Sequence, residues 1–290
     1  MKRLTALILI LLLLTSCAAP AEKIETAAPE IEGTPATGSI EFLLVGNDGN
    51  DKYYDKSNAT RIDNSPLSGK KIYWLGSSVT YGSGSNGQSL AHFLTETDGA
   101  VCTVDAVSGT TLATYDEGGE KSYVSRLVNG EKLKPEEKID LFVCQISTND
   151  CKDENMEHFG SLSDGFDDFD LSTAAGSVEY VIKYVTETWG CPIVFFSGSW
   201  FGDDGARSSQ SPSGTNYAKL VALTKEAAEK WGGHGVKVSV IDLYNDAEFN
   251  ALVSDDDYAY LMRDAIHPRK AGYLVWWLPK VRESLYEVFS

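Results

Sequence analysis

The stretch KIYWLGSSVTYG, residues 71–82, joins a short apolar run to two serines and a closing glycine. A continuous apolar run of this length is typical of a strand that is buried on both faces of a parallel sheet. Ser77 and Ser78 then stand directly at the end of that strand. Such a turn is either an ordinary loop or a support that holds one hydroxyl as a nucleophile. If it holds a nucleophile, other strand ends should supply a base, an acid and oxyanion donors.

Four more apolar runs of the same kind follow along the chain, and helix-like stretches separate them. Strand and helix alternation of this kind predicts a three-layer α/β/α domain with a flavodoxin-like sheet of about five mostly parallel strands. The further strands are expected at Val101–Val107, Ile139–Ile146, Pro192–Ser197 and Val236–Leu243. The helices between them are expected at Ser89–Thr97, Ser122–Asn129, Thr173–Trp189 and Thr215–Trp231.

The C-terminal segment shows the clearest helical spacing. Pro268 suits the first turn of a helix, and Pro279 is expected to kink it. Trp276 and Trp277 are assigned to the core because one face of this helix should be buried. The periodic apolar positions are Leu274, Leu278, Val281, Leu285 and Val288.

The N-terminus has the pattern of an export signal. Lys2 and Arg3 precede an apolar run that is short for a membrane span, which predicts a signal peptide over residues 1–17. Its end, Leu14 to Cys17, resembles the lipobox of bacterial lipoproteins, which implies lipidation of Cys17. An ordinary signal peptide and an N-terminal membrane helix are the alternatives. Residues 18–39 have the composition of a flexible tether, and residues 40–290 are expected to form a single domain.

The charge limits the possible partners. The chain has 42 acidic and 25 basic residues, a formal net charge of −17. Such a body is not expected to bind nucleic acid or anionic lipid headgroups. Membrane attachment is therefore expected through acyl chains alone, on the outer face of a bacterial membrane.

The cysteines and the acidic runs indicate neither a disulfide framework nor a metal. Export makes disulfides possible, but free buried thiols are favoured at Cys102, Cys144, Cys151 and Cys191, whose spacing matches no zinc pattern. The acidic runs at residues 46–56 and 162–170 do not have EF-hand spacing. No metal or other cofactor is expected.

Residues that could serve as oxyanion donors, as a base and as an orienting acid occur after the predicted strands and near the C-terminus. Gly109 in AVSGTT (residues 106–111) can offer a backbone N–H, and Asn149 in STND (residues 147–150) can offer an amide. In DAIHP (residues 264–268), Asp264 stands three residues before His267. This spacing lets the carboxylate hold the imidazole. Carboxyl ends of parallel strands share one edge of the sheet, so these groups should converge.

These four blocks, in this order, resemble those of the SGNH or GDSL-type hydrolases over about residues 71–273. The resemblance implies Ser78 as nucleophile, His267 as general base and Asp264 as its orienting partner. It also implies an oxyanion hole made by the Ser78 N–H, the Gly109 N–H and the Asn149 side chain.

Two residues depart from the family pattern. Ser77 stands where the family usually has Asp, and Ser147 stands where it usually has Gly. The first departure leaves Ser77 and Ser78 both open as the nucleophile. Ser78, two residues after Gly76, is favoured.

The resemblance implies a serine ester hydrolase that acts through an acyl-enzyme on carbohydrate acetates or other small esters. The loop SGSWFGDDGARSS (residues 197–209) puts Trp200 and Phe201 on the predicted active-site face. They are interpreted as a stacking platform for a sugar, with a hydrophobic lid or plain loop packing as alternatives. An O-acyltransferase, a lysophospholipase-like lipid esterase and a non-catalytic surface binding lipoprotein stay open as other functions. The sequence makes no prediction about oligomeric state.

Overall fold

A computed structural model describes residues 48–114, 121–130, 132–202, 207 and 212–290. The predicted signal peptide, the lipidation site Cys17 and the tether over residues 18–39 lie outside these described residues. None of the helices within the described ranges is long and apolar enough to span a membrane.

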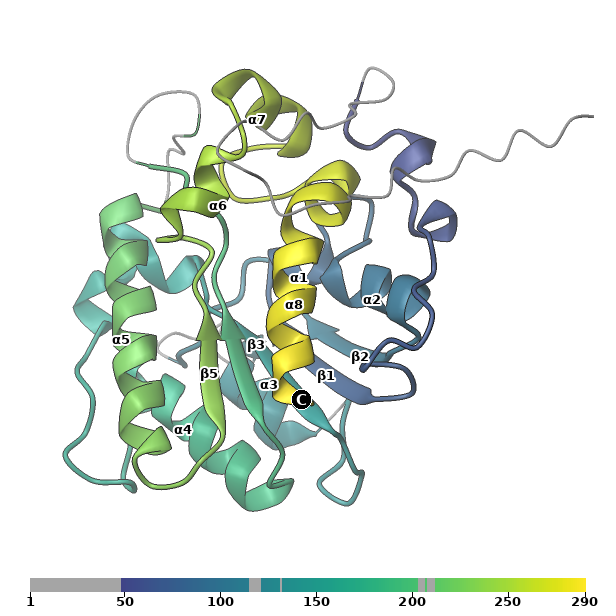
Figure 1. Ribbon diagram of the computed structural model, residues 1–290. Helices are drawn as coiled ribbons and strands as arrows, with labels where there is room; N and C mark the ends of the chain where they lie inside the picture. Colours follow the sequence, from purple (N-terminus) through teal and green to yellow (C-terminus); the bar gives the residue numbers. More distant parts are fainter. Residues whose placement is uncertain (1–47, 115–120, 131, 203–206, 208–211) are drawn as a thin grey trace, which may run out of the picture.

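Five parallel strands form one sheet in the order β2-β1-β3-β4-β5 (Figure 1), which confirms the predicted fold class. The direction of strand addition reverses between β1 and β3. In open α/β sheets, ligands bind outside the carboxyl ends of the strands at such a reversal. The strands are β1 (Lys71–Gly76), β2 (Val101–Ala106), β3 (Leu141–Gln145), β4 (Ile193–Phe196) and β5 (Val238–Ile241).

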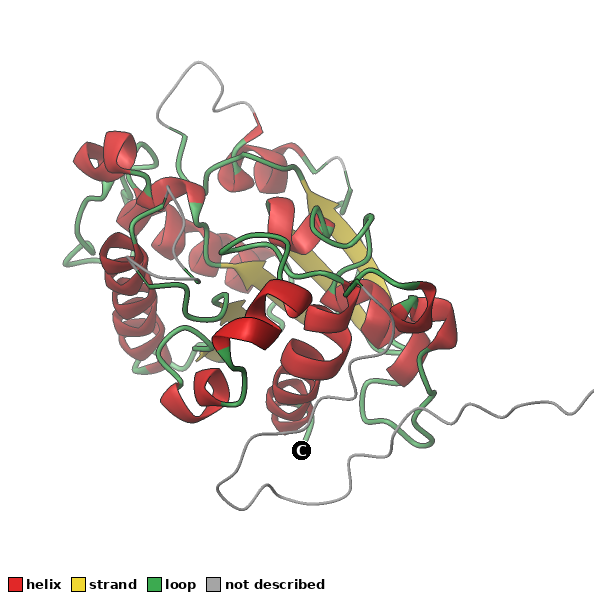
Figure 2. Cartoon of the chain, turned by 90° about the horizontal axis from the view of Figure 1, so that it is seen from above, coloured by secondary structure: helices red, strands yellow, loops and turns green. Residues whose placement is uncertain are grey.

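Helices cover both faces of the sheet, as the view from above shows (Figure 2). The longer ones agree with the predicted stretches to within one or two residues at most ends. The α-helices are α1 (Ser78–Tyr81), α2 (Leu90–Asp98), α3 (Tyr123–Asn129), α4 (Ala174–Thr188), α5 (Gly214–Gly232), α6 (Ala247–Ala251), α7 (Asp255–Leu261) and α8 (Leu278–Val288). Short 3₁₀ helices lie at Lys52–Tyr54, Lys56–Asn58, Asn149–Cys151 and Asp153–His158.

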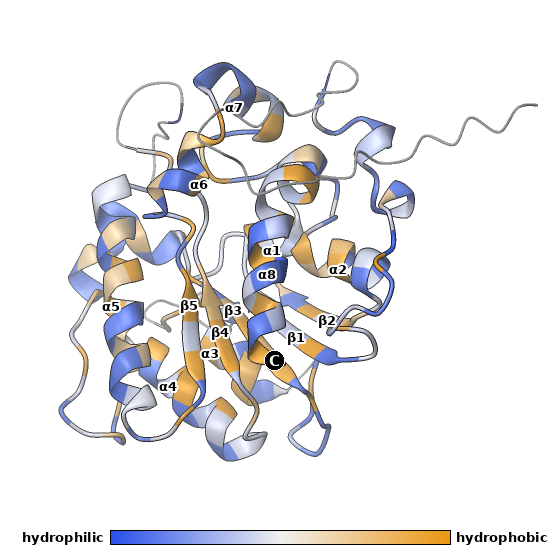
Figure 3. Cartoon of the chain, in the orientation of Figure 1, coloured by the Kyte–Doolittle hydropathy of each residue, from blue (hydrophilic) through white to orange (hydrophobic). Residues whose placement is uncertain are grey.

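The central strands are coloured as largely apolar (Figure 3), because each face of the sheet packs against its own layer of helices. In β3, Phe142 and Cys144 pack in a cluster with α3, α4 and α5. Leu141 and Val143, which alternate with them, pack in a second cluster with α2 and α8. A continuous apolar run is therefore what these strands require.

The C-terminal helix differs from its prediction. We expected one helix kinked at Pro279, but a π-helical turn, η6 (Gly272–Trp277), precedes α8. Pro279 is the second residue of α8, directly after this π-helical turn. Trp276 and Trp277 are buried as predicted, at 2% and 0% exposure. The irregularity of the C-terminal helix is therefore a π-helical turn directly before the proline.

The four cysteines in the described ranges have free thiols. Cys102 lies in β2 and Cys144 in β3, whereas Cys151 and Cys191 are buried at the ends of other elements. Burial raises the pKa of the Cys102 thiol to about 11. Such thiols stay protonated and behave as small apolar groups.

Candidate active site

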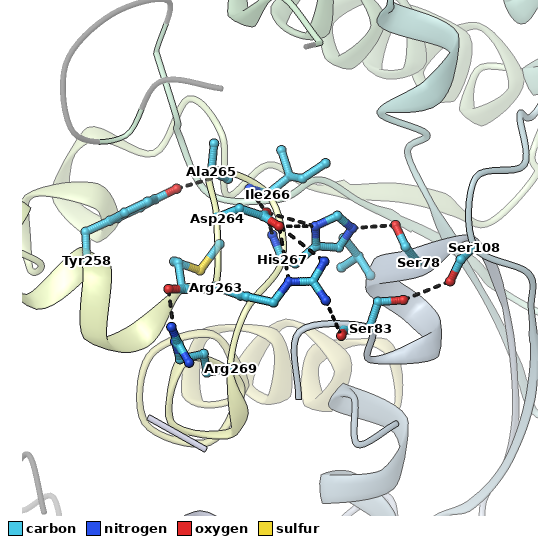
Figure 4. Close-up of polar contacts among 12 residues, drawn as sticks. Ser78, Ser83, Ser108, Tyr258, Arg263, Asp264, Ala265, Ile266, His267 and Arg269 are labelled. Atoms are coloured by element: carbon cyan, nitrogen blue, oxygen red, sulfur yellow. Dashed lines mark hydrogen bonds and ion pairs between the residues drawn. The ribbon is translucent and has the colours of Figure 1, made fainter. Parts of the chain in front are cut away.

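Ser78, His267 and Asp264 form a continuous hydrogen-bonded series (Figure 4). Ser78 is the first residue of α1, directly beyond β1, and its Oγ lies 2.7 Å from His267 Nε2. His267 Nδ1 lies 2.8 Å and 2.9 Å from the two carboxylate oxygens of Asp264. When Nδ1 carries the ring proton, it donates to the carboxylate, and Nε2 is left as the acceptor for the serine hydroxyl.

The segment between α7 and η6 holds the imidazole by local hydrogen bonds. Asp264 Oδ1 accepts the backbone N–H groups of Ile266 at 3.0 Å and His267 at 2.9 Å. Partial burial alone would raise the pKa of Asp264, but the imidazole and these N–H groups lower it well below its usual value. Asp264 is therefore ionised, and the same carboxylate shapes the turn and orients the ring.

Arg263 also contacts this carboxylate, a contact that was not predicted from the sequence. Its Nε and Nη2 each lie 3.3 Å from Asp264 Oδ2, and its Nη1 donates to the carbonyl of Ser83 at 2.7 Å. Ser83 lies just beyond α1. Arg263 therefore links the acid and base segment to the nucleophile segment. The one sequence feature that could have indicated this contact is the position of Arg263 directly before the predicted triad acid.

The predicted oxyanion donors lie on the loops after β2 and β3. Gly109 has a φ of +81°, a conformation that favours glycine. Asn149 Nδ2 donates one hydrogen bond, to the carbonyl of Thr110 at 2.8 Å. An amide nitrogen carries two hydrogens, so the second is available to a ligand. Within the described part of the chain, the N–H groups of Ser78 and Gly109 have no hydrogen-bond partner.

Asp150 joins these two loops, a role that the sequence did not indicate. Its carboxylate, 1% exposed, accepts the N–H groups of Leu112 at 2.7 Å and Ala113 at 3.1 Å. Burial raises the pKa of this carboxyl group above its ordinary value, although the hydrogen bonds oppose the shift. Ser147, which replaces the expected glycine, accepts the N–H groups of Asn149 and Asp150. The serine at position 147 thus supplies a side-chain acceptor for the turn that carries Asn149.

The two predicted aromatic contacts have different environments. Trp200 is 42% exposed, and the guanidinium carbon of Arg207 lies 5.8 Å from its ring centroid. Phe201 is 1% exposed and packs against Tyr217 and Tyr244 at centroid distances of 5.6 and 5.2 Å. The prediction that Phe201 contacts substrate is therefore wrong, because its ring lies in the core. Trp200 remains a candidate.

The acidic residues of the first run have protein partners. Asp48 pairs with Arg269, and Asp55 pairs with Lys270 and accepts from Gln88. Among the residues that the structure describes, no group of three or more His, Cys, Asp or Glu side chains could hold a metal ion.

The chain matches no protein-family model and no curated protein sequence. Solved structures are similar to it in fold. A Lactobacillus plantarum protein has a TM-score of 0.55 and 19% identity, with 76% of this chain and 98% of that chain covered. A protein named as a GDSL-like lipase, from Bacteroides ovatus, has a TM-score of 0.51 and 13% identity, with 76% and 99% covered.

A carbohydrate esterase family 2 enzyme from Myceliophthora fergusii, with a carbohydrate-binding domain, has a TM-score of 0.50 and 15% identity. There the similarity covers 78% of this chain and 68% of that chain. At sequence identities of 13–19%, the similarity to these proteins is a similarity of fold alone. The chain has the α/β fold of the SGNH or GDSL-type hydrolases.

Proposed function

We propose that this chain, which has the SGNH hydrolase fold, is a serine ester hydrolase with Ser78 as its nucleophile. One observation carries the proposal: Ser78 Oγ lies 2.7 Å from His267 Nε2, while His267 Nδ1 contacts the Asp264 carboxylate. This is the arrangement of nucleophile, base and orienting acid that acyl transfer requires. Ser77 is a poorer nucleophile because it is 0% exposed.

The residues suggest a two-step reaction. His267 takes the Ser78 proton as Oγ attacks the ester carbonyl, and Asp264 stabilises the imidazolium that forms. The N–H groups of Ser78 and Gly109 and the second amide hydrogen of Asn149 donate to the oxyanion. His267 then returns the proton to the departing alcohol, which leaves an acyl group on Ser78. Water, deprotonated by His267, releases this acyl group in the second step.

We further propose that the substrate is an acetylated carbohydrate. Trp200, exposed beyond β4, is suited to stack on a sugar ring. The carbohydrate esterase with a similar fold adds support.

The proposal also includes export and anchoring by lipid on Cys17, for which the support is the sequence alone. Wild-type full chain expressed in bacteria should incorporate labelled palmitate, and Cys17→Ala should not. Equal labelling of the two proteins would contradict this assignment.

The test of the activity compares the full chain with Ser78→Ala on p-nitrophenyl acetate, p-nitrophenyl octanoate and acetylated cello-oligosaccharides. We expect kcat to fall at least about 1,000-fold in the variant. Ser284→Ala, which alters a partly exposed serine on α8, is the matched control and should keep wild-type activity. Equal activity of wild type and Ser78→Ala would refute the nucleophile assignment. A preference for octanoate would favour the lipid esterase, and transfer of acetyl to an added sugar in preference to water would favour the acyltransferase.

A further inference from the structure

The turn that carries Ser78 lacks the usual cap of a helix N-terminus. Ser77 occupies the N-cap position of α1, but its side chain accepts no hydrogen bond from the helix. An N-cap serine ordinarily accepts the N–H of the second or third helical residue, which here includes Thr80. The helix has four residues, so it has little stability of its own.

Gln145 supplies the missing acceptor from a different strand. It is the last residue of β3 and is 2% exposed. Its Oε1 accepts the N–H of Thr80 at 3.0 Å, the hydroxyl of Thr80 at 2.9 Å and the N–H of Ser77 at 3.1 Å. One side-chain oxygen therefore binds the residues on both sides of Ser78.

The other end of the Gln145 amide binds the same turn. Nε2 donates to Ser77 Oγ at 3.1 Å, so Ser77 is an acceptor from Gln145 and not a cap for its own helix. The orientation of the amide is determined, because the two backbone N–H groups can only face its oxygen. The serine at position 77, where the resembling family has aspartate, thus provides an uncharged acceptor in a site with 0% exposure.

The surroundings of Gly76 bring these groups together. A Cβ at Gly76 would lie 2.0 Å from Thr80 Oγ1 and 2.9 Å from Gln145 Oε1, so only glycine permits the contact. The carbonyl of Gly76 accepts from Arg126 Nη2 at 2.7 Å, and Arg126 forms a buried ion pair with Asp105. The chain is thus fixed just before the nucleophile, and Gln145 fixes it around the nucleophile.

We propose that Gln145 is a positioning residue for the nucleophile. By holding Ser77 and Thr80, it keeps Ser78 Oγ in line with His267 and keeps the Ser78 N–H free for the oxyanion. The inference rests on the proposed function of Ser78. It adds to the site a residue at the end of β3 that acts through its hydrogen bonds to Ser77 and Thr80.

Two substitutions separate the polar role of Gln145 from its packing. Gln145→Met keeps a similar volume but removes the acceptor and the donor. Gln145→Glu keeps an acceptor for both N–H groups, and the Ser77 hydroxyl can rotate to donate to its second oxygen. Thr224→Val is the structural control, because Thr224 is 0% exposed and its hydroxyl donates to the carbonyl of Leu220 on α5.

With p-nitrophenyl acetate and the full-length proteins, we expect Gln145→Met to lower kcat on the order of 10- to 100-fold, with KM changed less than about threefold. Gln145→Glu should recover at least about half of this loss on a logarithmic scale. Thr224→Val should lose about as much thermal stability as Gln145→Met but should keep the wild-type kcat. The proposal would be overturned if the kcat of Gln145→Met lay within about threefold of that of Thr224→Val. It would also be overturned if the kcat of Gln145→Glu were no higher than that of Gln145→Met.

Amide hydrogen exchange provides a readout that does not depend on catalysis. The N–H groups of Ser77 and Thr80 should exchange at least about tenfold faster in Gln145→Met than in Thr224→Val. Unchanged protection of both amides would also overturn the positioning role. If the wild type hydrolyses no ester, the proposed function fails, and the exchange data still decide whether Gln145 orders the turn.

Discussion

Replacing Asn149 with alanine isolates one oxyanion donor. Of the two Nδ2 hydrogens, one is bound to the Thr110 carbonyl at 2.8 Å and the other is available to the transition state. Loss of the free hydrogen should lower kcat by about 100- to 1,000-fold, which corresponds to about 2.7–4 kcal/mol. Loss of the bound one should lower the free energy of unfolding by about 1 kcal/mol. The two consequences can be measured separately.

The assay is steady-state hydrolysis of p-nitrophenyl acetate, with thermal unfolding of the same samples. KM should change little, because the donor acts on charge that develops only in the transition state. Asn58→Ala is the control, since Asn58 Nδ2 also donates to a backbone carbonyl, that of Lys52 at 2.7 Å, away from the triad. It should keep wild-type kcat. A kcat of Asn149→Ala within fivefold of wild type, or an effect on KM alone, would refute the oxyanion role.

Three further predictions concern the acid, the aromatic loop and pH. Asp264→Asn should lower kcat by about 10,000-fold in steady-state assays, because His267 loses the partner that sets its tautomer. Trp200→Ala should raise KM for acetylated cello-oligosaccharide but not for p-nitrophenyl acetate, whereas Phe201→Ala should cost about 3–5 kcal/mol in chemical unfolding. Burial alone would raise the pKa of Asp98, but its hydrogen bonds and an arginine lower it. The ionised Asp98 therefore stabilises the fold above about pH 4, and this stabilisation is lost as the pH falls below that value. Below about pH 4, the thermal midpoint of Asp98→Asn should therefore change less with pH than that of the wild type.

The fold could be predicted because parallel strands with helices on both sides need apolar residues at every position. β3 and β4 show this directly, since every residue of Leu141–Gln145 and of Ile193–Phe196 is buried and all of them except Gln145 are apolar. The long helices were predictable from spacing. The π-turn at Gly272–Trp277 was not, because it depends on how the segment before Pro279 packs.

Loop side chains were predicted less well, for a physical reason. Trp200 and Phe201 are adjacent aromatic residues, yet Trp200 is 42% exposed and Phe201 is 1% exposed. In a strand or a helix, periodicity tells which of two neighbours is buried. An irregular loop has no period, so only its tertiary packing decides.

The sequence by itself determined which chemical groups the strand ends carry, and so it could nominate Ser78, Asp264 and His267. The sequence alone could not show that these residues meet. Ser78 and His267 are 189 residues apart in the chain, yet Ser78 Oγ lies 2.7 Å from His267 Nε2 in the structure. Gln145 had no motif, because two of its four hydrogen bonds to this turn involve backbone N–H groups, which every residue except proline possesses. Hydrogen-bonding capacity belongs to residue types, whereas the pairing of one donor with one acceptor depends on how the parallel strands align their ends.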